Sequence, residues 1–391
     1  MIDEKHILES LKTFSFPRLS GTEFERKSFN LARKKIKNLN LNPKIQEFVF
    51  STFFSRIYPR LSLFLLFWLH LILFLNIHIL FTTINISLVL FLLLILILIT
   101  RNPEKIKLGR KLYSQNIFVK LPLRSNEKKE TNIMERDKNR NILFFAHLDS
   151  KGQVFSVKFR VLLYYIWLSS FSFGLLVNII NSYFLFNAIF LSYICGILFL
   201  HVNGIATILV LLNFTNNKSK GAIDNASGIS IVMELLNFYS NPLNRLQNYN
   251  IWFVFTGAEE SGTMGVRNFY EYIKNFDRNN TYIINFDSVA KKVNLYDHGL
   301  FNNKNFKSYN YISENKDVMS IENVKRIYIG IYSDGLFLLK KKFQGIGNGD
   351  ESSYNYIHST NDDIDKINPL ILQRLCQFYI ILLNEIDSYS K

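Results

Sequence analysis

Two long stretches without charged residues divide this chain of 391 residues. Residues 61–100 contain no Asp, Glu, Lys or Arg in 40 positions, and residues 161–217 contain none in 57. About 20 consecutive apolar residues are enough to cross a bilayer as a helix. Core helices of soluble proteins do not reach these lengths without charge, so the pattern predicts two membrane-spanning hairpins, at 61–100 and 161–217.

Each stretch is interpreted as a pair of helices. The first suits two short helices with a turn near residues 81–85, and the second suits two longer ones with a turn near residues 181–187. Three helices would also fit the second stretch by length. However, His147 precedes it and Asp224 follows it. If both belong to one site, the chain must return to the side that it left. We therefore predict four transmembrane helices.

Basic residues surround both stretches, whereas the predicted hairpin tips carry no charge. They are Arg56, Arg60, Arg101, Lys105, Lys107, Arg110 and Lys111 around the first stretch, and Lys158, Arg160, Lys218 and Lys220 around the second. Because positive charge is retained on the cytoplasmic side, we expect a multi-pass membrane protein with its catalytic part in the cytoplasm. Phe214 and Asp224 are ten residues apart, which span at most about 35 Å. The site is thus expected near the membrane surface.

The remaining segments, 1–60, 101–160 and 218–391, have the pattern of one α/β domain. Short apolar runs at 45–51, 116–123, 141–146, 251–255 and 282–286 predict strands. Helical spacing follows Thr22, where Thr22-Glu23-Phe24-Glu25 has the form of a capping box. Further helices are predicted to begin at Gly228 and Pro369, and residues 124–140 are predicted to be a solvated loop. Alternating strands and helices favour a sheet with helices on both faces.

The formal net charge of +15 changes this picture little. A basic protein can bind nucleic acid, but no zinc-finger spacing or aromatic-rich basic motif is present. Because much of the charge flanks the apolar stretches, membrane lipid is the expected partner. The two cysteines, Cys195 and Cys376, have no ligand-type neighbours and are interpreted as ordinary buried thiols.

Several candidate site residues directly follow short apolar runs, namely His147, Asp149, Glu259, Glu260 and Asp287. Asp224 and His358 lie in turns rich in Gly or Ser and complete the set. Ligands at strand ends suit an α/β protein, whose crevices form beyond the carboxyl ends of the strands. Imidazole and carboxylate without thiolate are typical of a catalytic site for zinc or another divalent ion. A pair of such ions can activate a water and polarise a carbonyl.

The motifs that carry these residues resemble those of the M28 family of zinc metallopeptidases, the group of aminopeptidases that also includes glutaminyl cyclases. AHLDS, DNASG, GAEES, INFDS and HSTND match five motifs of that family in order. FPRLSGTEFE is similar to its opening, and YSDGLFL to a late Ser-Asp segment. The resemblance covers the chain outside the apolar stretches and implies a mixed central sheet, two zinc ions and a peptide substrate.

The resemblance also implies a role for each residue. His147 and Asp287 would hold one zinc ion, Glu260 and His358 the other, and Asp224 would bridge them. Asp149 would hydrogen-bond His147 and select its tautomer. Glu259 would be the general base, which takes a proton from water and passes it to the leaving amine.

Each of these residues has a simpler interpretation. His147 alone could be a core histidine, and Asp224 could cap the helix that follows it. His298 is a competing ligand, which we interpret as part of a surface loop. Asp350-Glu351 could be a solvated loop, and Asp334 is expected to be structural. The glycines from Gly345 to Gly349 follow no clear strand and lack the spacing of a dinucleotide loop, so we reject phosphate binding there.

The sequence departs from the family at two places near the expected substrate side. Gly347 stands where a proline is common, and the last motif reads His358-Ser359-Thr360 instead of His-Thr-Pro. The leading prediction is a membrane-bound exopeptidase of the aminopeptidase type. A glutaminyl-cyclase-like acyltransferase is the second prediction, although Asn225 after the bridging Asp favours hydrolysis. A non-catalytic membrane scaffold is the third, and the retained ligands and Glu259 argue against it.

Overall fold

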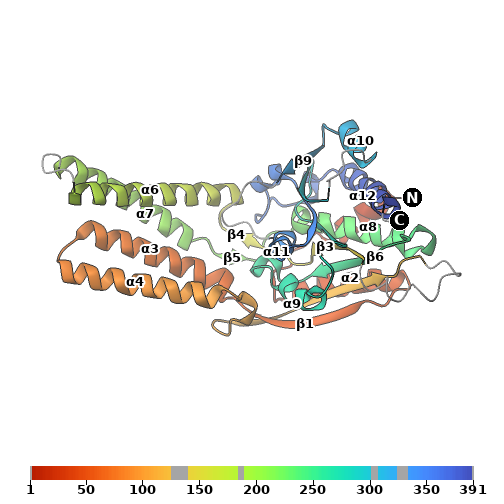
Figure 1. Ribbon diagram of the computed structural model, residues 1–391, viewed down its shortest axis with the longest axis horizontal. Helices are drawn as coiled ribbons and strands as arrows, with labels where there is room; N and C mark the ends of the chain where they lie inside the picture. The colour runs from red at the N-terminus through yellow and green to blue at the C-terminus, as the bar shows by residue number, and fades with distance from the viewer. Residues whose placement is uncertain (1, 125–139, 184–188, 301–306, 324–332, 390–391) are drawn as a thin grey trace. The chain divides into compact units, whose positions relative to one another are not determined.

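The computed structural model describes residues 2–124, 140–183, 189–300, 307–323 and 333–389 (Figure 1). The chain forms two compact units. The first consists of residues 1–50, 112–152 and 216–391, and the second of residues 51–111 and 153–215. The predicted loop at 124–140 lies almost entirely outside the described residues. Each unit is described below by itself.

An eight-stranded mixed sheet is the centre of the first unit, in the order β1-β2-β6-β3-β7-β10-β8-β9. The strands are β1 (Lys44–Ser51), β2 (Lys111–Leu121), β3 (Asn141–His147), β6 (Asn250–Thr256), β7 (Thr281–Phe286), β8 (Val293–His298), β9 (Met319–Asn323) and β10 (Gln344–Gly349). Strands β6, β3, β7 and β10 lie side by side in this order and run parallel to one another. Strands β2 and β8 pair antiparallel with β6 and β10. The sheet is therefore mixed, as expected.

Both faces of the central strand β3 are covered. Leu143 and Phe145 belong to a core with Phe269 of α9 (Met264–Ile273) and Leu338 of α11 (Asp334–Lys340). On the opposite face, Phe144 packs against Phe253, Phe286 and Tyr379. This face is covered by α8 (Gly228–Ser240) and α12 (Pro369–Tyr389), against which α1 (Glu4–Phe14) packs. A strand buried on both faces reads as a continuous apolar run, which is why NILFFAH was recognisable.

Among the described residues, the remaining α-helices of this unit are α2 (Glu23–Asn38) and α10 (Lys307–Glu314). The predicted start of α2 is confirmed, but the predicted capping box is wrong. Thr22 makes no side-chain cap, and its hydroxyl donates to Leu19 instead. Glu25 is almost fully buried, and its carboxylate accepts from the Gly21 amide at 2.6 Å, while the Thr22 amide donates to the Leu19 carbonyl.

The sequence did not reveal β8, β9 and β10. The run Gly345–Gly349 is itself part of strand β10. Glycine is uncommon in strands, but a Cβ on Gly345 would lie 1.8 Å from the carbonyl oxygen of Ile283 in β7. The interpretation of Asp350 as part of a solvated loop is also wrong. Asp350 is 3% exposed and accepts hydrogen bonds from the amides of Lys291 and Lys292.

Four long apolar helices make up most of the second unit. They are α3 (Tyr58–Leu75), α4 (Ile79–Thr100), α6 (Val157–Tyr183) and α7 (Ile189–Leu211). Each is long and apolar enough to cross a membrane. Their number agrees with the even count predicted from the sequence, and the second stretch contains two helices rather than three. Short strands β4 (Gly152–Gln153) and β5 (Thr215–Asn216) pair separately.

The turn in the first hairpin lies earlier than predicted. Helix α3 ends at Leu75 and α4 begins at Ile79, so the predicted turn at 81–85 is wrong. Asn76 ends α3 in the left-handed conformation with φ 37°, which asparagine tolerates better than most residues. His78 then caps α4 by accepting from the Leu80 amide. The turn of the second hairpin falls in residues 184–188, outside the described residues.

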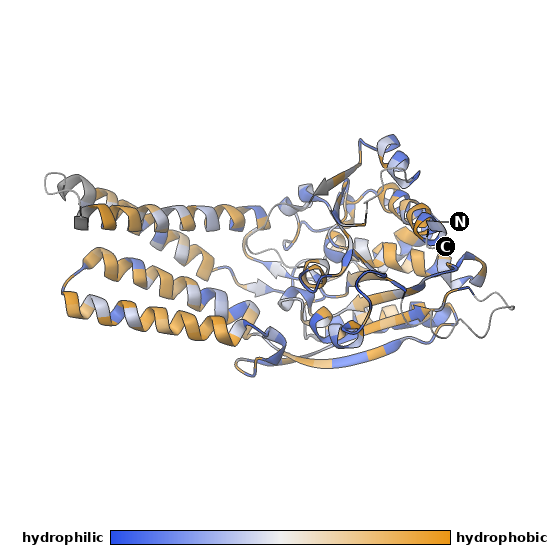
Figure 2. Ribbon diagram, viewed as in Figure 1, coloured by the Kyte–Doolittle hydropathy of each residue, from blue (hydrophilic) through white to orange (hydrophobic). Residues whose placement is uncertain are grey.

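The four helices pack through a few small and polar residues. Trp167 of α6 donates to the Thr207 hydroxyl of α7 at 2.9 Å. A Cβ on Gly174 would lie 2.1 Å from the His70 ring of α3, so this glycine permits close approach. Most residues of these helices are hydrophobic (Figure 2), and many of the large hydrophobic side chains are exposed. No more than 28% of the most apolar window of any of these helices is buried.

Candidate metal centre

Three adjacent parallel strands bring the candidate ligands to one edge of the sheet. His147 is the last residue of β3, Asp287 directly follows β7, and Glu259 and Glu260 follow β6. His147 pairs in register with Thr256 of β6. Because parallel neighbouring strands end at the same edge, residues more than 100 positions apart in sequence become neighbours.

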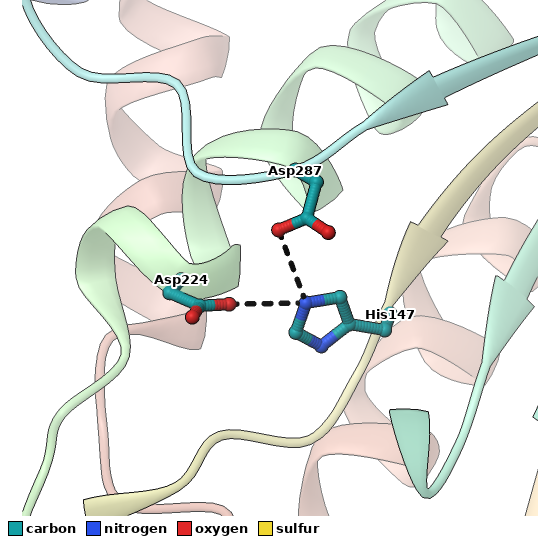
Figure 3. Close-up of side chains that lie close together, drawn as sticks. All are labelled: His147, Asp224 and Asp287. Carbon is teal, nitrogen blue, oxygen red and sulfur yellow. Dashed lines mark ion pairs between the residues drawn. The ribbon is translucent and has the colours of Figure 1, made fainter. Parts of the chain in front are cut away.

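Asp224 and Asp287 face the same nitrogen of His147 (Figure 3). The Nε2 atom lies 3.0 Å from Oδ1 of Asp224 and 3.7 Å from Oδ1 of Asp287. Each of these three residues offers one ligand atom. The three atoms lie within 4.8 Å of one another, close enough for all of them to bind one metal ion.

A second group shares Asp224. Nε2 of His358 lies 3.2 Å from Oδ2 of Asp224 and 2.9 Å from Oε1 of Glu260. Asp224, Glu260 and His358 again offer one ligand atom each within 4.8 Å. Asp224 therefore presents one oxygen to each group, which is the arrangement of a carboxylate that bridges two ions. It does not cap α8, because the N-cap of that helix is Ser227.

The donor atoms fit divalent ions. Within the described part of the chain, Nε2 of His147, Oδ1 of Asp224 and Oε1 of Glu260 are buried and make no hydrogen bond. Buried polar atoms without partners are costly, and a cation in each of the two groups would satisfy them. Two imidazoles and three carboxylates without thiolate are the ligand types of catalytic zinc sites. The fit therefore supports two ions, with Asp224 between them.

The backbone around His147 selects the tautomer that a metal requires. Its Nδ1 lies 3.1 Å from the carbonyl oxygen of Asp149. A carbonyl can only accept, so Nδ1 must carry the proton and Nε2 keeps its lone pair. Burial alone would lower the pKa of His147, but Asp149, Asp224 and Asp287 raise it well above its usual range.

The Asp149 carboxylate has a different main contact from the one expected. Oδ1 of Asp149 is 3.5 Å from Nδ1 of His147. The same carboxylate accepts a hydrogen bond from the Glu259 amide through Oδ1 at 3.1 Å and one from the Glu260 amide through Oδ2 at 3.0 Å. Ser20 donates to it as well, at 2.5 Å. Asp149 thus connects the β3 end to the turn that carries both glutamates.

The two adjacent glutamates are in different environments. Glu260 contacts His358 and Lys151, while Oε1 of Glu259 is buried and has no hydrogen-bond partner in the described residues. Burial raises the pKa of Glu259 well above its usual range, and the negative charges of Glu260 and Asp287 add to that effect. Glu259 is therefore suited to take up a proton near neutral pH.

Lys151 is a charged neighbour of the site that sequence reasoning missed. Its Nζ lies 2.7 Å from Oε2 of Glu260. Burial alone would raise the pKa of Glu260, but His358 and Lys151 lower it to about 2. Oε2 is thereby held by the lysine, and Oε1 is left for a metal. Lys151 directly follows the AHLDS motif, and this position was the signal in the sequence that could have revealed it.

Glu25 and Asp334 are buried acids that support the turn. Glu25 accepts from the Ala258 amide at 2.8 Å and the Ser114 hydroxyl at 2.7 Å, and burial raises its pKa to about 8. Asp334 accepts from the Thr256 hydroxyl, and burial raises its pKa to about 7. His298 belongs to neither ligand group and ends strand β8, so its interpretation as a loop residue is wrong.

Comparisons with known proteins agree with this geometry. A family model described as "Peptidase family M28" matches residues 199–381. An aminopeptidase from Aneurinibacillus sp. strain AM-1 has a similar structure, with a TM-score of 0.54 and 13% identity, over 98% of this chain and 94% of that chain. The zinc aminopeptidase BSAP from Bacillus subtilis gives 0.54 and 13%, over 99% and 95%. A glutaminyl cyclase from Fimbriiglobus ruber gives 0.53 and 12%, over 98% and 95%.

No curated protein matches the sequence. At these identities the structural likeness establishes the fold alone, an α/β fold that this chain shares with those aminopeptidases. The residues matched by the family model include the candidate ligands from Asp224 to His358. Residues 199–381 are thus similar in sequence to peptidase family M28, the family whose motifs this chain resembles.

The shared position of Asp224 predicts different zinc contents for different variants. We expect two zinc ions per wild-type chain, one after His147→Ala or His358→Ala, and none after Asp224→Asn, which weakens both groups. Zinc per chain after dialysis, measured by elemental analysis, checks this. His298→Ala is the matched control and should keep two ions. Two ions in the Asp224→Asn variant would contradict the bridging arrangement.

The Lys151 contact predicts unequal zinc affinities. The positive charge of Lys151 opposes the binding of a divalent cation by Glu260 and His358, so this group should bind zinc more weakly than the group of His147. Lys151→Met should therefore tighten the zinc affinity of the Glu260 group by about tenfold, or ~1.4 kcal/mol. Calorimetric zinc titration of the metal-free protein measures both affinities. Lys366→Met, at an exposed ion pair with Asp365, is the control. An unchanged affinity of the Glu260 group in Lys151→Met would contradict the prediction.

Proposed function

We propose that this protein is a membrane-anchored, two-zinc exopeptidase of the aminopeptidase type. The convergence of His147, Asp224, Glu260, Asp287 and His358 into two groups with one shared aspartate carries the proposal. Two zinc ions bound there would supply Lewis acidity that polarises a peptide carbonyl and makes water more acidic. We assign His147 and Asp287 to one ion, Glu260 and His358 to the other, and Asp224 to both.

Glu259 is the proposed general base. Its carboxylate is buried beside the ligands, and its raised pKa brings it closer to that of a proton acceptor at neutral pH. It would take a proton from the attacking water and deliver it to the nitrogen of the leaving amine, so that an N–H bond forms as the C–N bond breaks. Asp149 supports this role because it holds the Glu259 amide, and with it the position of the side chain.

Hydrolysis is favoured over cyclisation by the ligand set. The fold does not separate the two reactions, since aminopeptidases and a glutaminyl cyclase are similarly close in structure. The two complete ligand groups favour two ions. Asn225 is also retained, and its side chain donates to the Phe286 carbonyl next to Asp287. It thus joins the segment of Asp224 to that of Asp287.

Membrane anchoring is proposed from the apolar helices. A helix that is apolar on all sides requires a buried or lipid environment, and no more than 28% of the most apolar window of α3, α4, α6 or α7 is buried. The basic residues next to the helix ends favour an orientation in which the peptidase unit and the termini are cytoplasmic. Membrane lipid is then a partner of this protein, beside its peptide substrate.

Removal of the proposed base should abolish turnover without loss of zinc. Glu259→Gln is isosteric but cannot accept the proton, so we expect kcat for a peptide with a free N-terminus to fall by about 10²–10⁴-fold. Rates are measured with detergent-purified protein, and zinc content is measured in parallel. Glu314→Gln, on the exposed side of α10, is the control.

The same assay separates the competing reactions. N-acetylated peptides should not be cleaved if the enzyme is an aminopeptidase. Formation of pyroglutamate from an N-terminal glutamine, without release of amino acids, would identify a cyclase instead. Equal activity of the wild type and Glu259→Gln would show that Glu259 is not the base.

The proposed orientation predicts which residues a membrane-impermeant reagent reaches. In a Cys195→Ala background, cysteine at Ile77, between α3 and α4, should be labelled by an impermeant maleimide in intact cells. Cysteine at Lys218 should be labelled only after the cells are opened. The remaining Cys376 is fully buried and is not expected to react. Labelling of both positions, or of Lys218 alone, in intact cells would contradict this topology.

A further inference from the structure

Arg18 is a buried cation that the proposed chemistry does not use. Its side chain is completely inaccessible to solvent. It lies in the FPRLSG segment between α1 and α2, and every acceptor of its guanidinium is a backbone carbonyl oxygen. A buried arginine is costly to desolvate, and burial lowers its pKa to about 10. Such a residue is expected to have a specific purpose.

The guanidinium joins two segments that carry candidate ligands. Nε donates to the carbonyl of Leu148 at 2.9 Å, between His147 and Asp149. On its other side, Nη1 donates to Lys220 at 2.8 Å and Nη2 to Gly221 at 3.0 Å, in the turn before Asp224. The five donors of arginine have a rigid planar arrangement, so the group holds these two segments at a set separation.

The backbone of Arg18 adds a second connection at the same place. Its amide donates to the Ser150 hydroxyl at 2.9 Å, and its carbonyl accepts from the Ser150 amide at 3.0 Å. Gly221 has φ +60°, and a Cβ there would lie 2.4 Å from Cβ of Ser150 and 3.0 Å from Nη2 of Arg18. The two segments and the arginine are therefore in direct contact.

These two segments are far apart along the chain. Residues 153–215 lie between them in the sequence and belong to the second unit. The loss of chain entropy on closing a loop grows with its length, so contacts at the base of the loop have to keep its ends together. His147 and Asp224 lie on opposite sides of this insertion, yet their side chains must approach within about 3 Å for both to bind one ion.

We propose that Arg18 is a positioning residue for the metal centre, which sets the separation between the segment of His147 and the segment of Asp224 across the insertion. It touches neither substrate nor metal. Its effect is transmitted through the carbonyls of Leu148, Lys220 and Gly221. This inference rests on the proposed zinc centre, and it adds to that centre a residue located more than 120 positions before the first ligand.

The test compares zinc affinity in two arginine-to-lysine variants. Arg18→Lys keeps the charge but cannot contact three carbonyls in the plane of a guanidinium. Arg278→Lys is the matched control, because Arg278 also donates to backbone carbonyls, those of Lys341 and Lys274, but is not near the ligands. Zinc affinity is measured by competition with a fluorescent chelator, below the temperature at which either variant unfolds.

We expect Arg18→Lys to bind zinc about tenfold more weakly, as is typical when support of metal ligands is lost, and Arg278→Lys to bind it as the wild type does. Equal affinity in Arg18→Lys would overturn the proposal, since charge alone would then suffice. Equal weakening in both variants would also overturn it, because it would indicate general destabilisation.

A milder variant keeps the test valid if Arg18→Lys does not fold. Ser150→Ala removes the acceptor of the Arg18 amide and the longer hydrogen bond of 3.4 Å from the Ser150 hydroxyl to the Ser219 carbonyl. The loss of the shorter hydrogen bond corresponds to about a two- to tenfold weaker zinc affinity. An unchanged affinity in Ser150→Ala would overturn the proposal. Because affinity is read without turnover, an inactive Glu259→Gln or a failed peptidase assay does not affect this result, and the two proposals can fail separately.

Discussion

The structure depends on the burial of several carboxylates around one point. Asp224, Glu260 and Asp287 approach two imidazoles at the edge of the sheet, with Glu259 and Asp149 close by. Like charges at such distances repel strongly when water is excluded. Divalent ions at the centre would relieve this repulsion, and the same ions would provide the chemistry. Stability and function therefore place the same demand on these side chains.

A layer of hydrogen bonds keeps the ligands in place from behind. Asp149 holds the amides of Glu259 and Glu260, Glu25 holds the amide of Ala258, and Arg18 joins the segments before Asp149 and Asp224. These contacts are to the backbone, so they orient whole segments rather than single side chains. Ligand geometry can then remain constant although two apolar hairpins interrupt the chain that carries the ligands.

The apolar hairpins and the first unit differ in how they bury hydrophobic side chains. The sheet is stabilised by aromatic side chains packed on both faces of β3, whereas α3, α4, α6 and α7 leave many large hydrophobic side chains exposed. A lipid environment would accommodate that surface, and small residues such as Gly174 allow the helices to approach one another. Despite the insertions, the chain keeps a fold similar to that of solved aminopeptidases.

The sequence by itself determined the features that depend on local pattern. These were the four apolar helices, the buried strands β3, β6 and β7, and the motifs that carry His147, Asp224, Glu260, Asp287 and His358. It did not reveal β10, because glycine is a poor strand former and only the close approach of β7 explains Gly345. It also assigned Glu25 to a capping box.

Tertiary structure decided the partners of buried groups. Glu25 reaches Ala258, Lys151 reaches Glu260, and Arg18 reaches both ends of an insertion. Helix and strand periodicity depends on residues a few positions apart, so it is visible in the sequence. Hydrogen bonds between distant segments depend on how the sheet aligns them, and no local pattern contains that information.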